Sequence, residues 1–197
     1  MDRLSTVALL ALGALVALTA CDDGVAPVSA PGRVVAVQAT AEAPRAFCDV
    51  EFSAAEGQPL TWPTLSDGQS VPAATGPRWL NVWATWCHPC VDELPRLAEW
   101  ESQLAAQDAP IQLAFLSADA DAETVASFRE THTEAPDSLR MADPAELAEW
   151  VGQLGLDAGA SLPIHVITDA RGRVRCLRAG AVSEDDYPAV RSVIHAL

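Results

Sequence analysis

The chain contains no lysine, so all 12 of its basic residues are arginines, against 27 acidic residues. The resulting formal net charge of −15 argues against binding nucleic acid or anionic lipid head groups through a basic surface, because phosphates require a positive face. Half of the 197 residues are hydrophobic, which excludes a wholly disordered acidic chain and suits one domain of ordinary size. Five cysteines are too few for a disulfide scaffold but enough for paired chemistry.

The apolar run from Leu4 to Leu18 has 15 residues, fewer than the roughly 20 that a membrane-spanning helix needs. It follows Arg3 and the amino terminus, which is the layout of a secretory signal. The run ends in Leu18-Thr19-Ala20-Cys21, which resembles the bacterial lipobox. That resemblance implies cleavage before Cys21 and lipidation of its side chain. The alternative is an ordinary signal cleaved after Ala20, which leaves Cys21 as a free thiol.

A lipidated Cys21 would anchor the protein stably, because several acyl chains each contribute about 0.8 kcal/mol per buried methylene. Asp22 resembles an inner-membrane retention signal, so we expect the protein on the periplasmic side of a bacterial membrane, at the inner rather than the outer one. Disulfides persist in that compartment. We predict a signal peptide over 1–20, a lipidated N-terminus and flexible tether over 21–45, and one domain over 46–197. A strand at Val34, Val35 and Val37 is the alternative for part of the tether.

The domain is predicted to be of the α/β class. From 47 to 77 short apolar pieces alternate with turn residues, which indicates edge strands or loops. Strands and helices then alternate, which predicts a mixed sheet covered by helices on both faces. We expect strands at Trp79–Ala84, Ile111–Leu116, Leu139–Ala142, Ile164–Thr168 and Val174–Arg178, and helices at His88–Gln107, Asp121–Thr131, Pro144–Leu154 and Ser183–Ala196.

The motif that indicates chemistry is Trp86-Cys87-His88-Pro89-Cys90, at the junction of a predicted strand and a predicted helix. The amides and positive dipole end of that helix favour a thiolate at Cys87. Two intervening residues bring the sulfur of Cys90 within bonding distance, and Pro89 lies in the first turn, where its missing N–H is harmless. We therefore predict Cys87 as an exposed nucleophile and Cys90 as the buried resolving thiol.

A structural disulfide and a metal site are the alternatives for this pair. Zinc normally takes four ligands, but the chain has no second Cys-x-x-Cys and its histidines are scattered. With only Met1 and Met141, a thioether-rich copper site is not favoured either. The acidic clusters at 119–123 and 184–186 lack the EF-hand spacing, and they are explained by favourable interaction with predicted helix starts. We expect no metal and no cofactor.

The stretch from Asn81 to Pro95, NVWATWCHPCVDELP, resembles the thioredoxin fold and, within it, the TlpA/ResA-like family of extracytoplasmic thiol–disulfide oxidoreductases. The similarity covers roughly Gln58 to Leu197 in element order and includes Leu162-Pro163. It implies that Pro163 is cis and faces the cysteine pair, and that Leu162 offers backbone groups to a substrate segment.

The resemblance also implies a catalytic role for Glu93, three residues after Cys90, in tuning proton transfer. Partial burial would raise the pKa of Glu93 and let it take the proton of Cys90; an ordinary surface Glu is the alternative. Trp86, His88 and Pro89 are expected at the rim that binds substrate. His88 either stabilises the Cys87 thiolate as an imidazolium or is merely solvated. His165 is expected to be a satisfied interior or rim histidine rather than a catalytic group.

Two cysteines remain, Cys48 and Cys176. With Cys21 lipidated and Cys87 paired to Cys90, they would form a structural disulfide, and some TlpA-like proteins are similar in this respect. Such a bond would join the N-terminal lead-in to a late strand. The alternative is two buried thiols far apart.

The resemblance implies a membrane-anchored enzyme that reduces disulfides of extracytoplasmic protein substrates and is itself reduced by a membrane electron donor of the CcdA/DsbD kind. Two alternatives stay open. One is a disulfide oxidase or isomerase on the same fold. The other is a lipoprotein whose cysteine pair binds a metal or a partner without turnover.

Overall fold

The computed structural model describes residues 47–66 and 68–197; the predicted signal peptide, Cys21 and the tether lie outside the described residues. Within the described part, the strands form one six-stranded sheet in the order β1-β6-β5-β2-β3-β4. The strands are β1 (Val50–Glu51), β2 (Arg78–Trp83), β3 (Gln112–Ser117), β4 (Leu139–Arg140), β5 (Ile164–Thr168) and β6 (Val174–Ala179). β2, β3 and β4 are parallel, whereas β5, β6 and β1 join through antiparallel pairs. The sheet is therefore mixed, as predicted.

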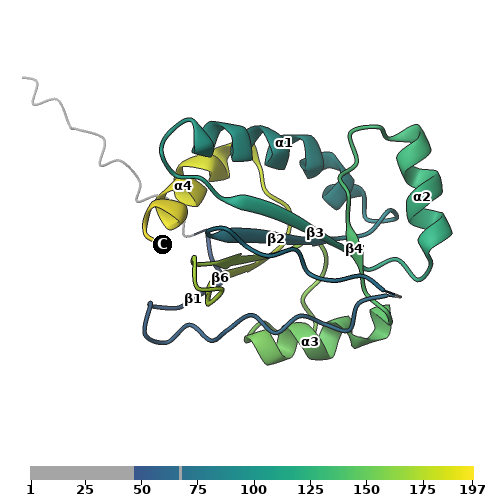
Figure 1. Cartoon of the computed structure of the whole chain (residues 1–197), viewed down its shortest axis with the longest axis horizontal. Helices are drawn as coiled ribbons and strands as arrows, with labels where there is room; N and C mark the ends of the chain where they lie inside the picture. The colour runs from purple at the N-terminus through teal and green to yellow at the C-terminus, as the bar shows by residue number, and fades with distance from the viewer. Residues whose placement is uncertain (1–46, 67) are drawn as a thin grey trace, which may run out of the picture. The chain divides into compact units, whose positions relative to one another are not determined.

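Helices cover both faces of this sheet, so the predicted α/β architecture is confirmed. The helices are α1 (His88–Ala105), α2 (Ala122–Thr131), α3 (Leu147–Leu154) and α4 (Tyr187–His195). Figure 1 shows α1 and α4 on one face and α3 on the other, with α2 beyond β4. The predicted C-terminal helix begins as a 3-10 turn, η2 (Glu184–Asp186), which Ser183 and Asp186 close with a capping box. A second 3-10 turn, η1 (Pro144–Glu146), precedes α3.

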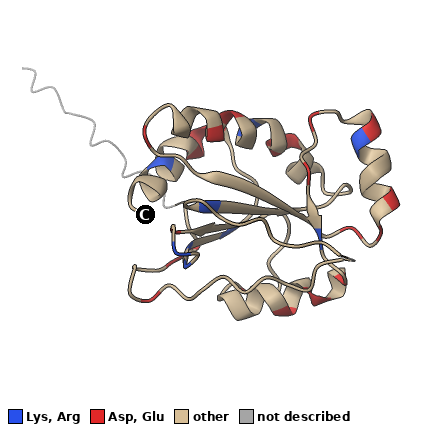
Figure 2. Ribbon diagram, in the orientation of Figure 1, with Lys and Arg blue, Asp and Glu red and all other residues tan. Residues whose placement is uncertain are grey.

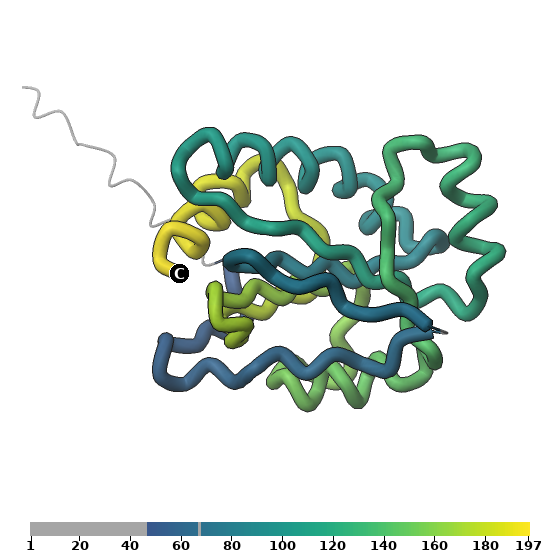
Figure 3. The backbone as a smooth tube through the Cα atoms, in the orientation of Figure 1, coloured from purple at the N-terminus to yellow at the C-terminus, as the bar shows by residue number. Residues whose placement is uncertain are grey.

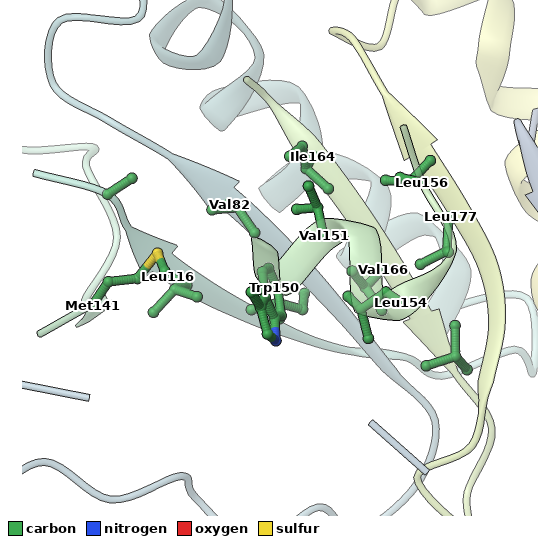
Figure 4. Packing of buried hydrophobic residues seen from close by; sticks show 13 residues of the cluster. Val82, Leu116, Met141, Trp150, Val151, Leu154, Leu156, Ile164, Val166 and Leu177 are labelled. Carbon is green, nitrogen blue, oxygen red and sulfur yellow. The ribbon is translucent and has the colours of Figure 1, made fainter. Parts of the chain in front are cut away.

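The central strand β2 divides the hydrophobic core. All six of its residues are buried, because β5 and β3 flank it and helices cover both faces. Leu80 and Val82 pack in the cluster on the α3 side, together with Trp150 and Val151 of α3 (Figure 4). Trp79 and Trp83 belong to clusters on the α1 side. This alternation follows from the two-residue period of a strand.

The lead-in from 47 to 77 is mostly loop with one short strand, which agrees with the predicted edge strands or loops. It runs beside α3, as the tube in Figure 3 shows. Trp62 and Leu65 pack against the cluster on the α3 side, and the indole of Trp150 donates a hydrogen bond to the carbonyl of Thr61 at 2.7 Å. The lead-in therefore completes the core on that face.

Acidic residues mark α1, α2 and α3, and arginines are fewer (Figure 2). In the part of the chain that the structure describes, no helix combines the length and apolar character needed to cross a membrane. The same residues contain no group of three or more histidine, cysteine, aspartate or glutamate side chains placed to hold a metal ion.

Candidate active site

Cys87 lies between the end of β2 and the start of α1, as the N-cap residue of that helix. Its backbone N–H donates to the carbonyl of Ala84 at 3.0 Å, which closes the turn between strand and helix. Cys87 and Cys90 form a disulfide with their Cα atoms 5.3 Å apart. Pro89 lies in the first turn of α1, so its ring does not interrupt the helix. The reactive pair is thus held at the positive end of the longest helix in the described part.

Both cysteines are buried in an apolar cluster with Trp83, Ala84 and Leu94. Cys90 is fully buried, and Cys87 is 6% exposed. The prediction of an exposed Cys87 is therefore wrong in degree, because in the disulfide both residues pack against the end of β2. The predicted order still holds, because Cys87 is the more accessible of the two.

The peptide bond between Leu162 and Pro163 is cis. It directly precedes β5, which is antiparallel to β2, the strand that leads to Cys87. Leu162 is half-buried and packs against the apolar cluster that holds both cysteines. The carbonyl of Pro163 accepts a hydrogen bond from the N–H of Gly180 at 2.8 Å. The cis bond thus lies at the position that the resemblance implied.

Glu93 is fully buried, so the alternative of an ordinary surface glutamate is wrong. It lies one helical turn after Cys90, and both side chains are on the buried face of α1. Its Oε1 accepts a hydrogen bond from Nδ2 of Asn81, and its Oε2 accepts one from the N–H of Val182, both at 2.8 Å. Burial raises the pKa of Glu93 to about 7, against the lowering effect of these two donors and of nearby arginines.

His165 is fully buried on β5, in register with Asn81 of β2, so its predicted interior position is confirmed. Its Nδ1 accepts a hydrogen bond from the indole of Trp79 at 3.2 Å, and its Nε2 lies 3.2 Å from the carbonyl of Gly180. Burial, together with the nearby charge of Arg178, lowers the pKa of His165 to about 3. The ring is therefore neutral at physiological pH.

The rim around the cysteines is open to solvent. Trp86 is 66% exposed, the one large hydrophobic side chain exposed to that extent in the described residues. His88 and Pro89 are exposed as well. A pocket of about 700 Å³ separates the Trp86 loop from the start of α2 and is lined by Thr85, Trp86, Asp121, Glu123, Thr124, Ser127 and Phe128. The surface beside Trp86 is therefore hollowed.

The sequence did not predict the role of Asp119, which we expected at a helix start with Asp121. Asp119 is buried and accepts hydrogen bonds from the N–H of Thr85 at 3.1 Å and its Oγ1 at 2.7 Å. Because β2 and β3 are parallel, the residues after them meet at one edge of the sheet, so Asp119 fixes the loop that leads to Cys87. The available signal was an acidic residue two positions after the end of an apolar strand. Asp121 lies at the start of α2, as predicted, and is the N-cap of that helix.

Two curated proteins are similar to this chain in sequence. The chain is 26% identical over 110 residues to a thioredoxin-like protein, YneN, of Bacillus subtilis, covering 54% of this chain and 58% of that protein. It is 30% identical over 114 residues to a thiol:disulfide interchange protein, a DsbE homolog, of Paracoccus denitrificans, covering 57% and 55%. The chain thus spans little more than half the length of these curated relatives. No family model matches the chain.

Among solved structures, a DsbF homologue from Corynebacterium diphtheriae superposes with a TM-score of 0.56 at 19% identity, covering 75% of this chain and 92% of that one. This likeness shows the fold. The described domain therefore has a thioredoxin fold. The named relatives confirm the resemblance to thioredoxin-like thiol–disulfide oxidoreductases that the sequence indicated.

Proposed function

We propose that this protein is a thiol–disulfide oxidoreductase that reduces disulfides of extracytoplasmic partner proteins through Cys87 and Cys90. The observation that carries the proposal is the position of this pair. It lies at the start of α1 beside the cis peptide bond of Leu162 and Pro163, with buried Glu93 one turn further along the helix. Each of these features serves one step of disulfide exchange.

In the first step the Cys87 thiolate attacks one sulfur of the partner's disulfide. A mixed disulfide forms, and the other partner sulfur leaves as a thiolate and takes up a proton. The N-terminal end of α1 stabilises the attacking thiolate, and an imidazolium at His88 would add to that effect. The rim formed by Trp86, His88 and Pro89 receives the partner, whose extended segment pairs with the backbone at Leu162.

In the second step Cys90 gives its proton to Glu93 and attacks the sulfur of Cys87. The second partner sulfur leaves as a thiolate and takes up a proton from solvent, Glu93 later returns its proton to solvent, and the protein is left with the Cys87–Cys90 disulfide. Two electrons have then passed from the dithiol to the partner. A membrane electron donor of the CcdA/DsbD kind would restore the dithiol.

The lipid anchor at Cys21 and the periplasmic location belong to this proposal. The apolar run before Cys21 and the relationship to a DsbE homolog support them. Two disulfides among the described residues are also typical of an oxidising compartment. Location at a membrane would keep the protein beside an electron donor in that membrane.

Substituting Cys90→Ala is expected to accumulate a mixed disulfide between Cys87 and its partner, because the resolving thiol is absent. The variant is expressed as the full chain in a bacterium with a periplasm. Adducts are captured after acid quenching and identified by non-reducing electrophoresis and mass spectrometry. Cys87→Ala/Cys90→Ala is the matched control and should give no adduct. If Cys90→Ala forms no adduct with any extracytoplasmic protein, the proposal fails.

The direction of electron flow is tested by the reduction potential of the pair. A reductase should have a value near the approximately −270 mV of thioredoxin, whereas an oxidase lies far above it. Equilibration with glutathione redox buffers, followed by thiol alkylation and mass spectrometry, gives the value. A value close to the approximately −120 mV of the strong oxidant DsbA would replace the proposed reductase with an oxidase on the same fold.

A further inference from the structure

Three buried polar side chains lie between two apolar clusters on the α1 side of the sheet. Asn81 on β2 separates Trp79, in the cluster beneath the second half of α1, from Trp83, in the cluster that holds the cysteines. Asn81, Glu93 and His165 are all fully buried. Polar groups without access to water are costly unless they are hydrogen-bonded, so the partners of each atom decide its state.

The indole of Trp79 fixes the tautomer of His165. An indole N–H is only a donor, so Nδ1 of His165, 3.2 Å from it, accepts and carries no proton. The proton of the neutral ring is then on Nε2, which lies 3.2 Å from the carbonyl of Gly180 and 3.6 Å from Oε1 of Glu93. The single lone pair of Nδ1 is then shared between the indole N–H of Trp79 at 3.2 Å and the amide N–H of Asn81 at 3.4 Å.

This lone pair fixes the amide of Asn81 in turn. Nδ2 of Asn81 lies 3.4 Å from Nδ1 of His165 and donates to Oε1 of Glu93 at 2.8 Å. A rotated amide would place Oδ1 against the lone pair of Nδ1, which is repulsive. In the observed orientation Oδ1 is buried and has no hydrogen-bond partner among the described residues. The amide therefore keeps its N–H toward Glu93 although its own oxygen is left unsatisfied.

We propose that His165 is a positioning residue for Glu93: its neutral ring holds the Asn81 amide with the N–H toward the carboxyl, and so sets the pH range in which Glu93 accepts the proton of Cys90. The inference deepens the proposed function and rests on it. Without an acceptor at position 165, the amide of Asn81 would be free to rotate. Its Oδ1 would then accept a hydrogen bond from protonated Glu93 and favour the acid over the carboxylate.

The other charged groups near Glu93 do not replace this effect. Arg96 on α1 is paired with Glu184, and Arg178 on β6 lies 3.6 Å from Asp186. Both arginines favour an ionised Glu93, and neither has its ion-pair partner at residue 165. The titratable and charged groups around Glu93 and His165 are Cys90 and Arg96 of α1, Arg178 of β6 and Asp186 of η2. Cys90 is on the buried face of α1 with Glu93, and Asp186 acts on His165 and lies beside Arg178.

The test uses the reduced full chain and 5,5′-dithiobis(2-nitrobenzoate). Cys87 attacks this disulfide and releases one thionitrobenzoate; Cys90 then attacks Cys87 and releases the second. Stopped-flow absorbance separates the two phases. In His165→Phe, the pH profile of the second phase should move about one unit to higher pH, and its rate at pH 7 should fall about fivefold. The first phase should be unchanged.

His165→Asn is the matched variant, because Oδ1 of asparagine can replace Nδ1 as acceptor; its second phase should follow the original pH profile. A folded His165→Phe protein with an unshifted profile overturns the inference, and so does His165→Asn behaving like His165→Phe.

Nitrogen-15 NMR of the unmodified protein tests the protonation of His165 without any variant. It should show His165 with the proton on Nε2 and no protonation of the ring between pH 5 and 8. The other tautomer, or protonation within that range, also overturns it. The reagent needs no partner protein, so failure to trap a partner would leave these results standing.

Discussion

Breaking the disulfide between Cys48 and Cys176 with a double alanine substitution is expected to lower the free energy of unfolding by about 5 kcal/mol. The bond joins residues 128 apart in sequence, and closing so long a loop removes much conformational freedom from the unfolded chain. It also anchors Phe47, which packs edge-on against Trp79 and lies beneath the guanidinium of Arg178. Without the bond, the lead-in loses its covalent link to β6.

Urea unfolding of the original protein and the variant measures this loss. The matched control is Cys87→Ala/Cys90→Ala, which removes a bond between residues only three apart in sequence. That short loop restricts the unfolded chain far less, so the control should lose much less stability. A loss below about 1 kcal/mol for Cys48→Ala/Cys176→Ala would show that packing of Phe47 and β1 alone holds the lead-in.

Substituting Glu93→Gln is expected to slow release of the mixed disulfide at pH 7 about 100-fold, because the amide cannot accept the proton of Cys90. Gln preserves the shape of the side chain and can keep one acceptor for the donors at Asn81 and Val182. The second phase of thionitrobenzoate release measures the rate. The exposed Asp92→Asn, one residue earlier on α1, is the matched control and should leave the rate unchanged. An unchanged rate in Glu93→Gln would remove Glu93 from the mechanism.

The same substitution should change how stability depends on pH. The pKa of Glu93 is raised from 4.5 to about 7, so its contribution to stability is present below pH 4.5 and is lost as the pH rises through 7. The pKa of His165 is lowered from 6.5 to about 3, so its contribution is present above pH 6.5 and is lost as the pH falls through 3. Between pH 4.5 and 6.5 the two effects oppose each other.

In Glu93→Gln, only the lowered pKa of His165 still affects how stability depends on pH between pH 4.5 and 6.5. Stability should then rise with pH, by up to about 1.4 kcal/mol per pH unit, whereas in the original protein the contributions of this pair nearly cancel. Urea unfolding at several pH values between 4.5 and 6.5 gives both curves. Parallel curves for the two proteins would mean that Glu93 does not carry a raised pKa.

The sequence predicted the strands and helices from β2 onward to within two residues at each end, apart from two helices. α3 begins three residues later than predicted, after the 3-10 turn η1, and α4 begins four residues later, after η2. Apolar residues recur there with clear periods, and a cysteine pair at a strand–helix junction has a definite chemical context. The late start of α4 has a local cause, because Pro188 is tolerated only in a first turn, so the chain from Ser183 begins as a 3-10 turn.

The hydrogen-bond partners of the site residues could not be predicted, because they are distant in sequence from the residues they contact. Asn81 looks like a polar interruption of an apolar strand, and its contacts with Glu93 and His165 span 12 and 84 residues. Asp119 contacts Thr85 across 34 residues, through the parallel pairing of β2 and β3. The full burial of Glu93 depends likewise on Val182, 89 residues away. Such contacts arise only when the sheet has assembled.

The most direct test of the account is the ionisation of Cys87. The reduced Cys90→Ala variant, which leaves Cys87 as the one thiol of the pair, is alkylated with iodoacetamide over a range of pH. The site of modification is followed by mass spectrometry. Because Cys87 caps the N-terminal end of α1, its pKa should lie well below the approximately 8.5 of free cysteine, near neutrality. A pKa of about 8.5 or higher would contradict the account, since Cys87 would then be no better a nucleophile than an ordinary thiol.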